Sequence, residues 1–338
     1  MPKHDAPIPR EWRRWAAAAL LDGTALVDVL ATLSRQGYSE AESIRFCARL
    51  YDDPVFEAGQ WVAAQLQKFR SVLLMRDQMW RLSDAAVEVN RRSGMSGQQF
   101  LEEYYSRNKP VIMTDVCDRW PARTLWSSDY LIDKVGGVGV EVMVRTDSGP
   151  DYEDNAEQHR FVVPFSEYVE NVQTTSRSKA LCLVADNKLL ADPAARSLWD
   201  DFEIDPRFLR SSRDYGRTFM WFGAARTVSP LRHDTMNVLF NQVVGRQLFI
   251  LIPSLAVHRM YNNVGVYSDV DPIAPDLDRY PLFAGADQFH FELGPGESVF
   301  LPAGWWHRVE TLDTSVSISF TSFRYDNDIA WSNPTRRL

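Results

Sequence analysis

The sequence has 338 residues, which is long enough for one large domain, or for a large and a small domain, around a buried core. Its 37 basic and 45 acidic residues give a formal net charge of -8, which argues against a broad nucleic-acid-binding surface. The three cysteines have no motif spacing and indicate reduced thiols in a cytoplasmic protein. No apolar run approaches the roughly 20 residues that a membrane helix needs, so we expect a soluble chain without a membrane partner.

The N-terminal part of the chain, from residue 9 to about residue 82, has the apolar spacing of helices. Thr24 is the expected N-cap of one helix and Gly37 its expected end, while Ser39 and Glu42 form the expected capping box of the next. One face of the long helix predicted after residue 54 should pack against something, because it carries Val62, Leu66, Phe69 and Leu73. We expect a structural or dimerisation module without chemistry of its own, which would serve a homodimer.

The rest of the chain changes to short β-rich runs that are separated by proline, glycine and polar residues. VLFNQVV and QLFILIP flank Gly245 and Arg246, which predicts a hairpin. Many short strands at this spacing predict the α+β class, mainly β, with a double-stranded β-helix, or jelly roll, as the core. The predicted domains are an N-terminal helical region, residues 1–85, and a jelly-roll domain, residues 86–338.

Two residues on separate predicted strands are candidate metal ligands. His307 follows LPAGWW, a tight turn that would fix the start of a strand at the mouth of a barrel, and Asp234 lies on an earlier strand. A His-x-Asp pair on one strand and a distant histidine on another form a facial triad, which holds iron(II) and leaves its other positions open. Asp234 and His307 are therefore the first candidates for metal binding and catalysis.

The sequence blocks around these residues resemble the JmjC-type cupin-like oxygenases, the bacterial relatives of the asparaginyl and protein hydroxylases. NKPVIMTDVCDRWPA is similar to the block near the start of that domain, and two later blocks are MYNNVGVYSDVDPIAPDLDRYPLFAGA and GPGESVFLPAGWWHRVETLDTSVSISFTSF. The resemblance covers the chain from about residue 82 to residue 328. It implies a jelly roll, iron(II) and 2-oxoglutarate as cofactors, and His307 as the distal metal ligand.

The chain departs from the family pattern at two positions. The family has Pro-Leu-His-x-Asp where this chain has PLRHD, so Arg232 replaces the first histidine ligand and His233 falls on the variable position. The family lysine that grips the distal carboxylate of 2-oxoglutarate is here Gln247, and Arg246 precedes it. Two of the residues that define the implied chemistry are therefore missing.

Side-chain alternation along a strand decides how much these departures matter. Arg232 and Asp234 should face the barrel interior together, whereas His233 should point to the other side and could ligate a metal only if a bulge re-aims it. An arginine stays protonated, so Arg232 would repel a metal or pair with Asp234. Gln247 can form a hydrogen bond to the carboxylate of 2-oxoglutarate but supplies no charge. Arg246 is one residue away from the position of the family lysine, so its side chain should point to the other face of the strand.

Further residues have a candidate role and a plainer structural alternative. Ser229 and Asn187 are expected cosubstrate contacts, against the alternatives of a turn serine and a loop asparagine bound to the backbone. His159 follows the acidic stretch 151–157 and is expected on a mobile loop that could close over the barrel mouth. The same acidic stretch weakly favours a basic substrate over a simple solvated loop.

Four functions are open at this point. One is an oxygenase with an altered centre, built on Asp234, His307 and either His233 or water as the third ligand, that hydroxylates a peptide or protein side chain or a small metabolite. Another is a degenerate relative that keeps its pocket as a binding or partner module without iron or 2-oxoglutarate. The others are a metal-free enzyme in which Arg232 holds an anionic substrate, and a metal-binding cupin that never used 2-oxoglutarate. An arginine that holds an anion should point into an open cavity and not lie sealed against Asp234.

Overall fold

The computed structural model describes residues 7–83, 88–144, 160–174, 181–183, 187–262 and 265–331. The chain divides into two compact units, Met1–Gln78 and Met79–Leu338. His159 and the acidic stretch 151–157 lie outside the described residues, so their predicted role as a loop over the barrel mouth stays a prediction. Among the described residues, no helix combines the length and the apolar character needed to cross a membrane.

The described part of the first unit is helical. Its helices are α1 (Arg10–Leu21), α2 (Leu26–Arg35), α3 (Glu40–Tyr51) and α4 (Pro54–Trp80), the last of which crosses the boundary between the units. Their buried side chains form one small core of Ile8, Ala16, Val29, Leu33, Tyr38, Phe46 and Cys47.

The helix ends confirm part of the predicted capping. Thr24 does not cap α2, because the helix begins one residue later and has Ala25 at the N-cap position. Gly37 follows α2 with φ +88°, a conformation that glycine adopts without strain. The Ser39 hydroxyl accepts a hydrogen bond from the Glu42 backbone N–H at 3.3 Å. The carboxylate of that glutamate bonds to an arginine one turn later, so only half of the predicted capping box forms.

The apolar face of α4 is left uncovered by the other helices of its unit. Val62, Leu66 and Phe69 have 50%, 62% and 66% of their surface exposed. The prediction that this face packs against something is therefore not met within the unit.

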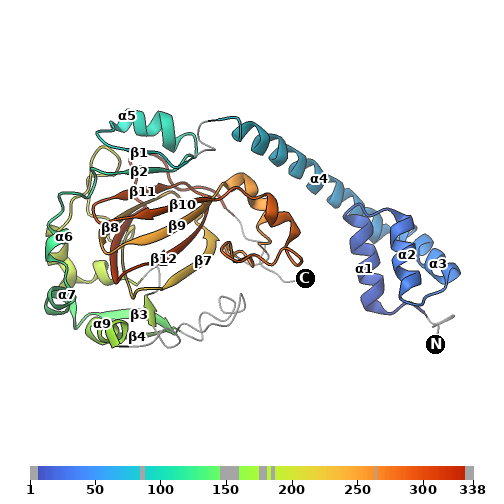
Figure 1. Ribbon diagram of the computed structural model, residues 1–338, viewed down its shortest axis with the longest axis horizontal. Helices are drawn as coiled ribbons and strands as arrows, with labels where there is room; N and C mark the ends of the chain where they lie inside the picture. The colour runs from blue at the N-terminus through green and yellow to red at the C-terminus, as the bar shows by residue number, and fades with distance from the viewer. Residues whose placement is uncertain are drawn as a thin grey trace. The chain divides into compact units, whose positions relative to one another are not determined.

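The second unit contains three sheets in its described part (Figure 1). The six-stranded sheet consists, in spatial order, of β1 (Arg91–Arg92), β2 (Val111–Met113), β11 (Ser298–Leu301), β8 (Val238–Val244), β13 (Ser315–Phe320) and β6 (Thr218–Gly223). The four-stranded sheet consists of β10 (Phe289–Leu293), β9 (Gln247–Ile252), β12 (Trp306–Thr311) and β7 (Val228–His233). The three-stranded sheet consists of β4 (Arg160–Pro164), β3 (Gly139–Val144) and β5 (Leu181–Leu183).

Strands β6 to β13 form the predicted jelly roll, because they divide into two four-stranded halves, β11-β8-β13-β6 and β10-β9-β12-β7. The predicted hairpin at Gly245 is wrong. Strand β8 pairs with β11 and β13, whereas β9 pairs with β10 and β12, so the turn carries the chain from one sheet to the other. Gly245 has φ +73°, and a side chain there would clash with the Thr314 carbonyl oxygen, which makes glycine necessary in this crossing.

Short helices surround the sheets in the described part of the second unit. They are α5 (Gly97–Phe100), the π-turn Leu101–Tyr105, α6 (Ala122–Leu125), α7 (Ser128–Val135), α9 (Phe165–Thr174) and the 3-10 turns Leu189–Ala191, Pro193–Asp200, Ser254–Arg259 and Pro281–Gly285. The largest buried cluster joins side chains of α6, α7 and α9 to side chains of β6, β8 and β13. Figure 1 shows α5 beside β1 and β2, at one edge of the six-stranded sheet.

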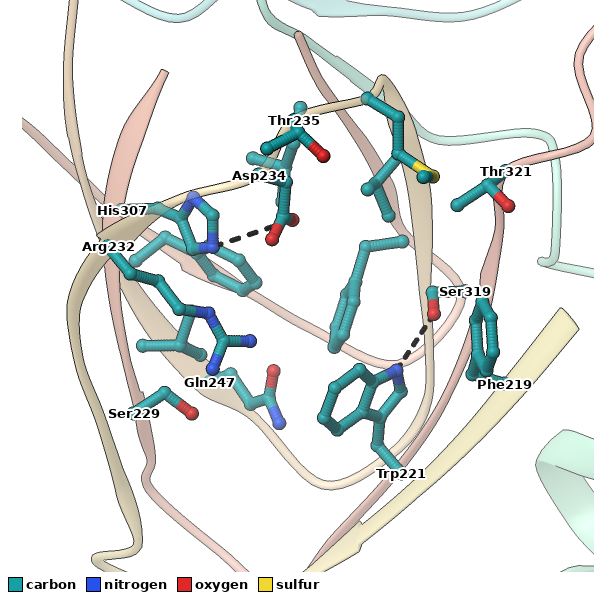
Figure 2. A pocket seen from close by; sticks show the side chains of 16 residues that line it. Phe219, Trp221, Ser229, Arg232, Asp234, Thr235, Gln247, His307, Ser319 and Thr321 are labelled. Carbon is teal, nitrogen blue, oxygen red and sulfur yellow. Dashed lines mark hydrogen bonds and ion pairs between the residues drawn. The ribbon is translucent and has the colours of Figure 1, made fainter. Parts of the chain in front are cut away.

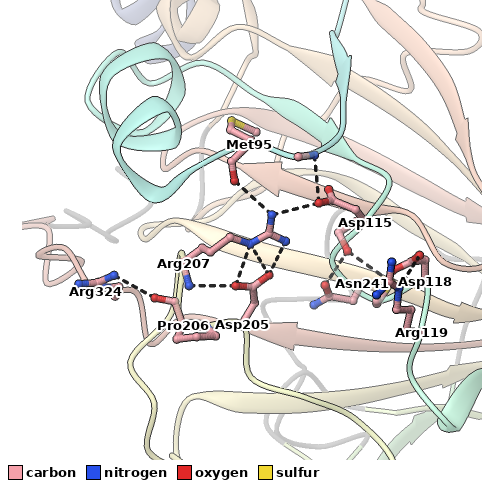
Figure 3. Close-up of polar contacts among 12 residues, drawn as sticks. Met95, Asp115, Asp118, Arg119, Asp205, Pro206, Arg207, Asn241 and Arg324 are labelled. Carbon is pink, nitrogen blue, oxygen red and sulfur yellow. Dashed lines mark hydrogen bonds and ion pairs between the residues drawn. The ribbon is translucent and has the colours of Figure 1, made fainter.

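One arginine ties the start of the jelly-roll unit to the segment before β6 (Figure 3). Arg207 forms a two-point ion pair with Asp205, whose shorter contact is 2.7 Å, and a second ion pair of 3.0 Å with Asp115. It also donates to the Met95 carbonyl oxygen at 3.2 Å. The hydrogen bonds to Asp205, followed by those to Asp115, raise the pKa of the guanidinium, which therefore remains charged and satisfied.

Candidate functional site

A cavity of about 260 Å³ opens inside the jelly roll (Figure 2). The lining residues Ser229, Arg232, Asp234, Gln247 and His307 lie on one side, and the polar residues Ser319 and Thr321 lie away from them. Trp221 and Phe219 of β6 lie on the opposite side. Further apolar lining residues are Met236, Val238, Phe240, Phe249, Leu301 and Val309. The cavity is therefore amphipathic, which is typical of sites for organic ligands.

Strand β7 and the residue after it supply three of the polar side chains. Arg232 lies opposite His307, and Ser229 lies opposite Val309. His307 and Val309 share one face of β12, so both of their partners on β7 face the cavity. This arrangement requires one extra residue in β7 between Ser229 and Arg232, a β-bulge at Pro230 on an edge strand where proline is tolerated.

The structure does not bring His233 into the cavity. Its position between Arg232 and Asp234 turns its side chain to the other face of the sheet, as strand alternation dictates. There its ring makes an edge contact with Trp306 at 4.7 Å between centroids, and its Nδ1 lies 3.3 Å from the Asp234 carbonyl oxygen. The bulge in β7 lies before Arg232 and does not turn His233 towards the cavity. His233 is therefore a packing residue.

The turn before β12 fixes the orientation of His307. Gly304 donates its N–H to the carbonyl oxygen of Asp234 at 2.9 Å, and the Trp305 indole donates to Asn108, so both sides of the turn are held. The His307 Nδ1 lies 3.1 Å from the Trp305 carbonyl oxygen. A carbonyl oxygen can only accept, so Nδ1 carries the proton of the neutral ring and Nε2 presents its lone pair to the cavity.

His307 and Asp234 lie close together without a proper hydrogen bond. The Nε2 atom of His307 is 3.7 Å from Oδ2 of Asp234, and only 3% of the histidine is exposed. Desolvation is the main reason why the pKa of His307 is lowered, while the negative charge of Asp234 raises it and the positive charge of Arg232 lowers it further. The ring is therefore neutral at pH 7.

Gln247, at the start of β9, is another buried polar residue of the lining. Only 6% of it is exposed, and its Oε1 atom has no hydrogen-bond partner among the described residues. Arg246 lies outside the cavity, where it is paired with Asp313 at 2.8 Å and with Glu292 at 3.4 Å. Asn187 also lies outside it and binds the backbone, donating to the Met220 carbonyl oxygen and accepting from the N–H of Leu189.

The Arg232 guanidinium points into the cavity and is not sealed against Asp234 (Figure 2). No hydrogen bond or ion pair to this half-buried side chain occurs among the residues that the structure describes. The pairing of Arg232 with Asp234 that the sequence allowed is therefore not observed. The cavity thus contains a fixed positive charge that forms no ion pair with a described residue.

These side chains do not fit the iron centre that the family resemblance implies. Iron(II) of this kind needs three ligands on one face, and the described part of the chain contains no group of three or more His, Cys, Asp or Glu side chains that could hold a metal. Asp234 and His307 remain, but the third position holds an arginine, which cannot ligate and repels a cation. Gln247 likewise supplies no charge for the distal carboxylate of 2-oxoglutarate.

The apolar side of the cavity was not among the predicted site residues. Along β6, Phe219 and Trp221 alternate with Met220 and Phe222, which are buried in the largest core cluster. The Trp221 indole donates to the Ser319 hydroxyl at 2.8 Å, and this bond fixes the ring at the cavity wall. The alternation in TFMWFG is the signal that could have identified these two aromatic residues.

Comparisons with known proteins match this domain. A family model described as Cupin-like domain matches residues 97–327. Lysine-specific demethylase JMJ30 of Arabidopsis thaliana is 32% identical over 237 residues, which cover 69% of this chain and 54% of that protein. Lysine-specific demethylase 8 of Xenopus tropicalis is 29% identical over 244 residues, 70% of this chain and 53% of that protein. For tRNA wybutosine-synthesizing protein 5 of Homo sapiens, the identity is 26% over 256 residues, 69% of this chain and 77% of that protein. The chain spans about half the length of the two demethylases.

Proposed function

Because the chain belongs to the Cupin-like domain family, we propose that its jelly roll keeps the pocket as a binding site for an organic ligand with a carboxylate group and does not assemble an iron and 2-oxoglutarate centre. The observation that carries this proposal is the Arg232 guanidinium, which lines the pocket beside Asp234 and His307 without a described partner. Of the four functions considered from the sequence, this proposal corresponds to the binding module. It is also compatible with the metal-free enzyme in which Arg232 holds the substrate.

The physical argument is the cost of leaving a charge unpaired in a partly desolvated cavity. A charged group that loses its water needs an opposite charge or hydrogen-bond acceptors in return. A carboxylate meets this need best, because its two oxygens match the planar fork of an arginine in a two-point contact. Of the described lining residues, Arg232 is the one with a fixed positive charge, so it sets where the anionic group of a ligand lies.

An oxygenase with an altered centre is the second candidate function, as a hydroxylase of a peptide or protein side chain or of a small metabolite. The observation in its favour is that Asp234 and His307, two of the three implied ligands, still lie 3.7 Å apart in the pocket. It would require Arg232 to turn away and a water molecule to complete the ligand set, because His233 faces the other side of the strand.

Iron binding and 2-oxoglutarate turnover separate the two candidates. The purified protein is reconstituted with iron(II) without air, desalted, analysed for iron, and then exposed to oxygen with 2-oxoglutarate while succinate is measured. We expect neither stoichiometric iron nor succinate from the unaltered protein. An Arg232→His, Gln247→Lys double variant is the positive control for iron retention, since it restores both missing side chains. Stoichiometric iron with succinate formation by the unaltered protein would overturn the proposal in favour of the oxygenase.

A further inference from the structure

Two polar atoms on the charged side of the cavity face each other without a hydrogen bond. Oδ2 of Asp234 and Nε2 of His307 face each other at 3.7 Å, and Nδ1 of the histidine donates its proton to the Trp305 carbonyl oxygen at 3.1 Å. Oε1 of Gln247 is an acceptor without a partner among the described residues. The Asp234 carboxylate forms no hydrogen bond to the histidine at this distance, and a cationic donor is the most favourable partner for a carboxylate.

The charges of the cavity have both signs at neighbouring places. Arg232 and Asp234 are two residues apart on one face of the chain, so their Cα atoms are about 7 Å apart at the rise of an extended strand. They do not pair with each other in the described structure. A ligand with a positive and a negative group on adjacent atoms would satisfy both residues at once. A dicarboxylate such as 2-oxoglutarate would instead bring its second negative charge towards Asp234.

The opposite wall indicates the rest of the ligand. Trp221 is fixed by its bond to Ser319, and Phe219 lies beside it, so the cavity presents aromatic surface across from the charged residues (Figure 2). Phe240 of β8 and Leu301 of β11, strands of the same sheet as β6, also line the cavity. Such a wall favours a large apolar group, which gains free energy by leaving water.

From these three features we infer that the cavity binds a free α-amino acid with a large apolar side chain. Its carboxylate pairs with Arg232, its ammonium group lies between Asp234 and His307, where the relatives' pattern would place a metal, and its side chain packs towards Trp221. This inference rests on the proposed function and adds the class of ligand. It makes the ammonium group the replacement for the metal cation.

Calorimetric titration of the chelator-treated protein tests this inference. The probes are L-leucine, L-phenylalanine and L-tryptophan, together with 3-phenylpropanoic acid, which lacks the ammonium group, phenethylamine, which lacks the carboxylate, and 2-oxoglutarate. We expect at least one of the amino acids to bind. We also expect L-phenylalanine to bind about tenfold or more tightly than either of its truncated analogues, because each analogue leaves one buried charge unpaired.

Variants assign each group of the ligand to a residue. Arg232→Gln should weaken L-phenylalanine and 3-phenylpropanoic acid by about tenfold or more, whereas Asp234→Asn should weaken only L-phenylalanine. Arg246→Gln is the matched control, since that arginine is exposed and paired outside the cavity, and it should change neither affinity. Equal affinity for L-phenylalanine and 3-phenylpropanoic acid would overturn the amino-acid inference and leave the anion site intact. If no carboxylate binds to the unaltered protein, both proposals are overturned.

Discussion

Arg207 and Arg232 lie in the same unit and are both partly buried, yet their surroundings differ. Arg207 forms ion pairs with Asp205 and Asp115 and also donates to a carbonyl oxygen. Arg232 points into a cavity, and no partner for it occurs in the described part of the chain. Folding thus supplies every contact of one arginine and leaves the other to a ligand. A partly buried charge whose partners are missing is a better sign of a binding site than a charge that is merely buried.

The largest expected effect on stability belongs to the satisfied arginine. Arg207→Ala removes the charge that holds two carboxylates, so it should lower the free energy of unfolding by about 1–3 kcal/mol. Arg213→Ala is the matched control, because Arg213 forms a single exposed ion pair with Asp200 and such pairs contribute about 0–1 kcal/mol. Urea denaturation of both variants provides the comparison. Equal losses would remove the distinction between a structural arginine cluster and an ordinary surface pair.

A smaller effect is expected at the unpaired arginine. Arg232→Met removes a charge that has no internal counter-ion and keeps an unbranched side chain, so the free energy of unfolding should change by less than about 1 kcal/mol and can even increase. Saturating L-phenylalanine should then raise the melting temperature of the unaltered protein but not that of the variant. A destabilisation as large as that of Arg207→Ala would identify Arg232 as a structural residue.

The smallest effect on ligand binding is expected on the other face of β7. His233→Gln loses the ring contact with Trp306, which is worth about 0.5–1.5 kcal/mol for aromatic pairs, and should lower the melting temperature slightly. The affinity for L-phenylalanine should not change, since the residue faces away from the cavity. A calorimetric titration with L-phenylalanine and a thermal melt of the variant measure these two quantities. A clear loss of ligand affinity would show that the two faces of this strand do not work separately.

Local sequence rules predicted a substantial part of this domain. The run VLFNQVV has the bounds of β8, and QLFILIP begins with β9 and ends one residue after it. The alternation rule correctly predicted that Arg232 and Asp234 face the cavity and that His233 faces away from it. The turn in LPAGWW correctly predicted a strand that begins just before His307. These features depend on the alternation of side chains and on turn-forming residues within a few positions of each other, so a single sequence is enough to predict them.

The remaining features depend on distant parts of the chain. A glycine turn does not tell which sheet the next strand joins, so the sequence predicts a hairpin at Gly245 although this turn connects the two sheets. Ser229 faces the cavity only because of the bulge at Pro230, which becomes visible in the pairing with β12. Whether Arg232 pairs with Asp234 or stays open is a choice of side-chain conformation inside a packed barrel, and neither residue type decides it.

The central claim is that the cavity binds a ligand whose carboxylate contacts Arg232 and whose ammonium group occupies the place where the family resemblance implies a metal. A crystal structure of the protein grown with manganese(II) and L-phenylalanine, with anomalous diffraction recorded for the metal, tests it most directly. We predict ligand density whose carboxylate contacts Arg232 and whose ammonium group lies between Asp234 and His307, without an anomalous peak at that place. An anomalous peak bound by Asp234 and His307, with the arginine turned out of the cavity, would contradict the account.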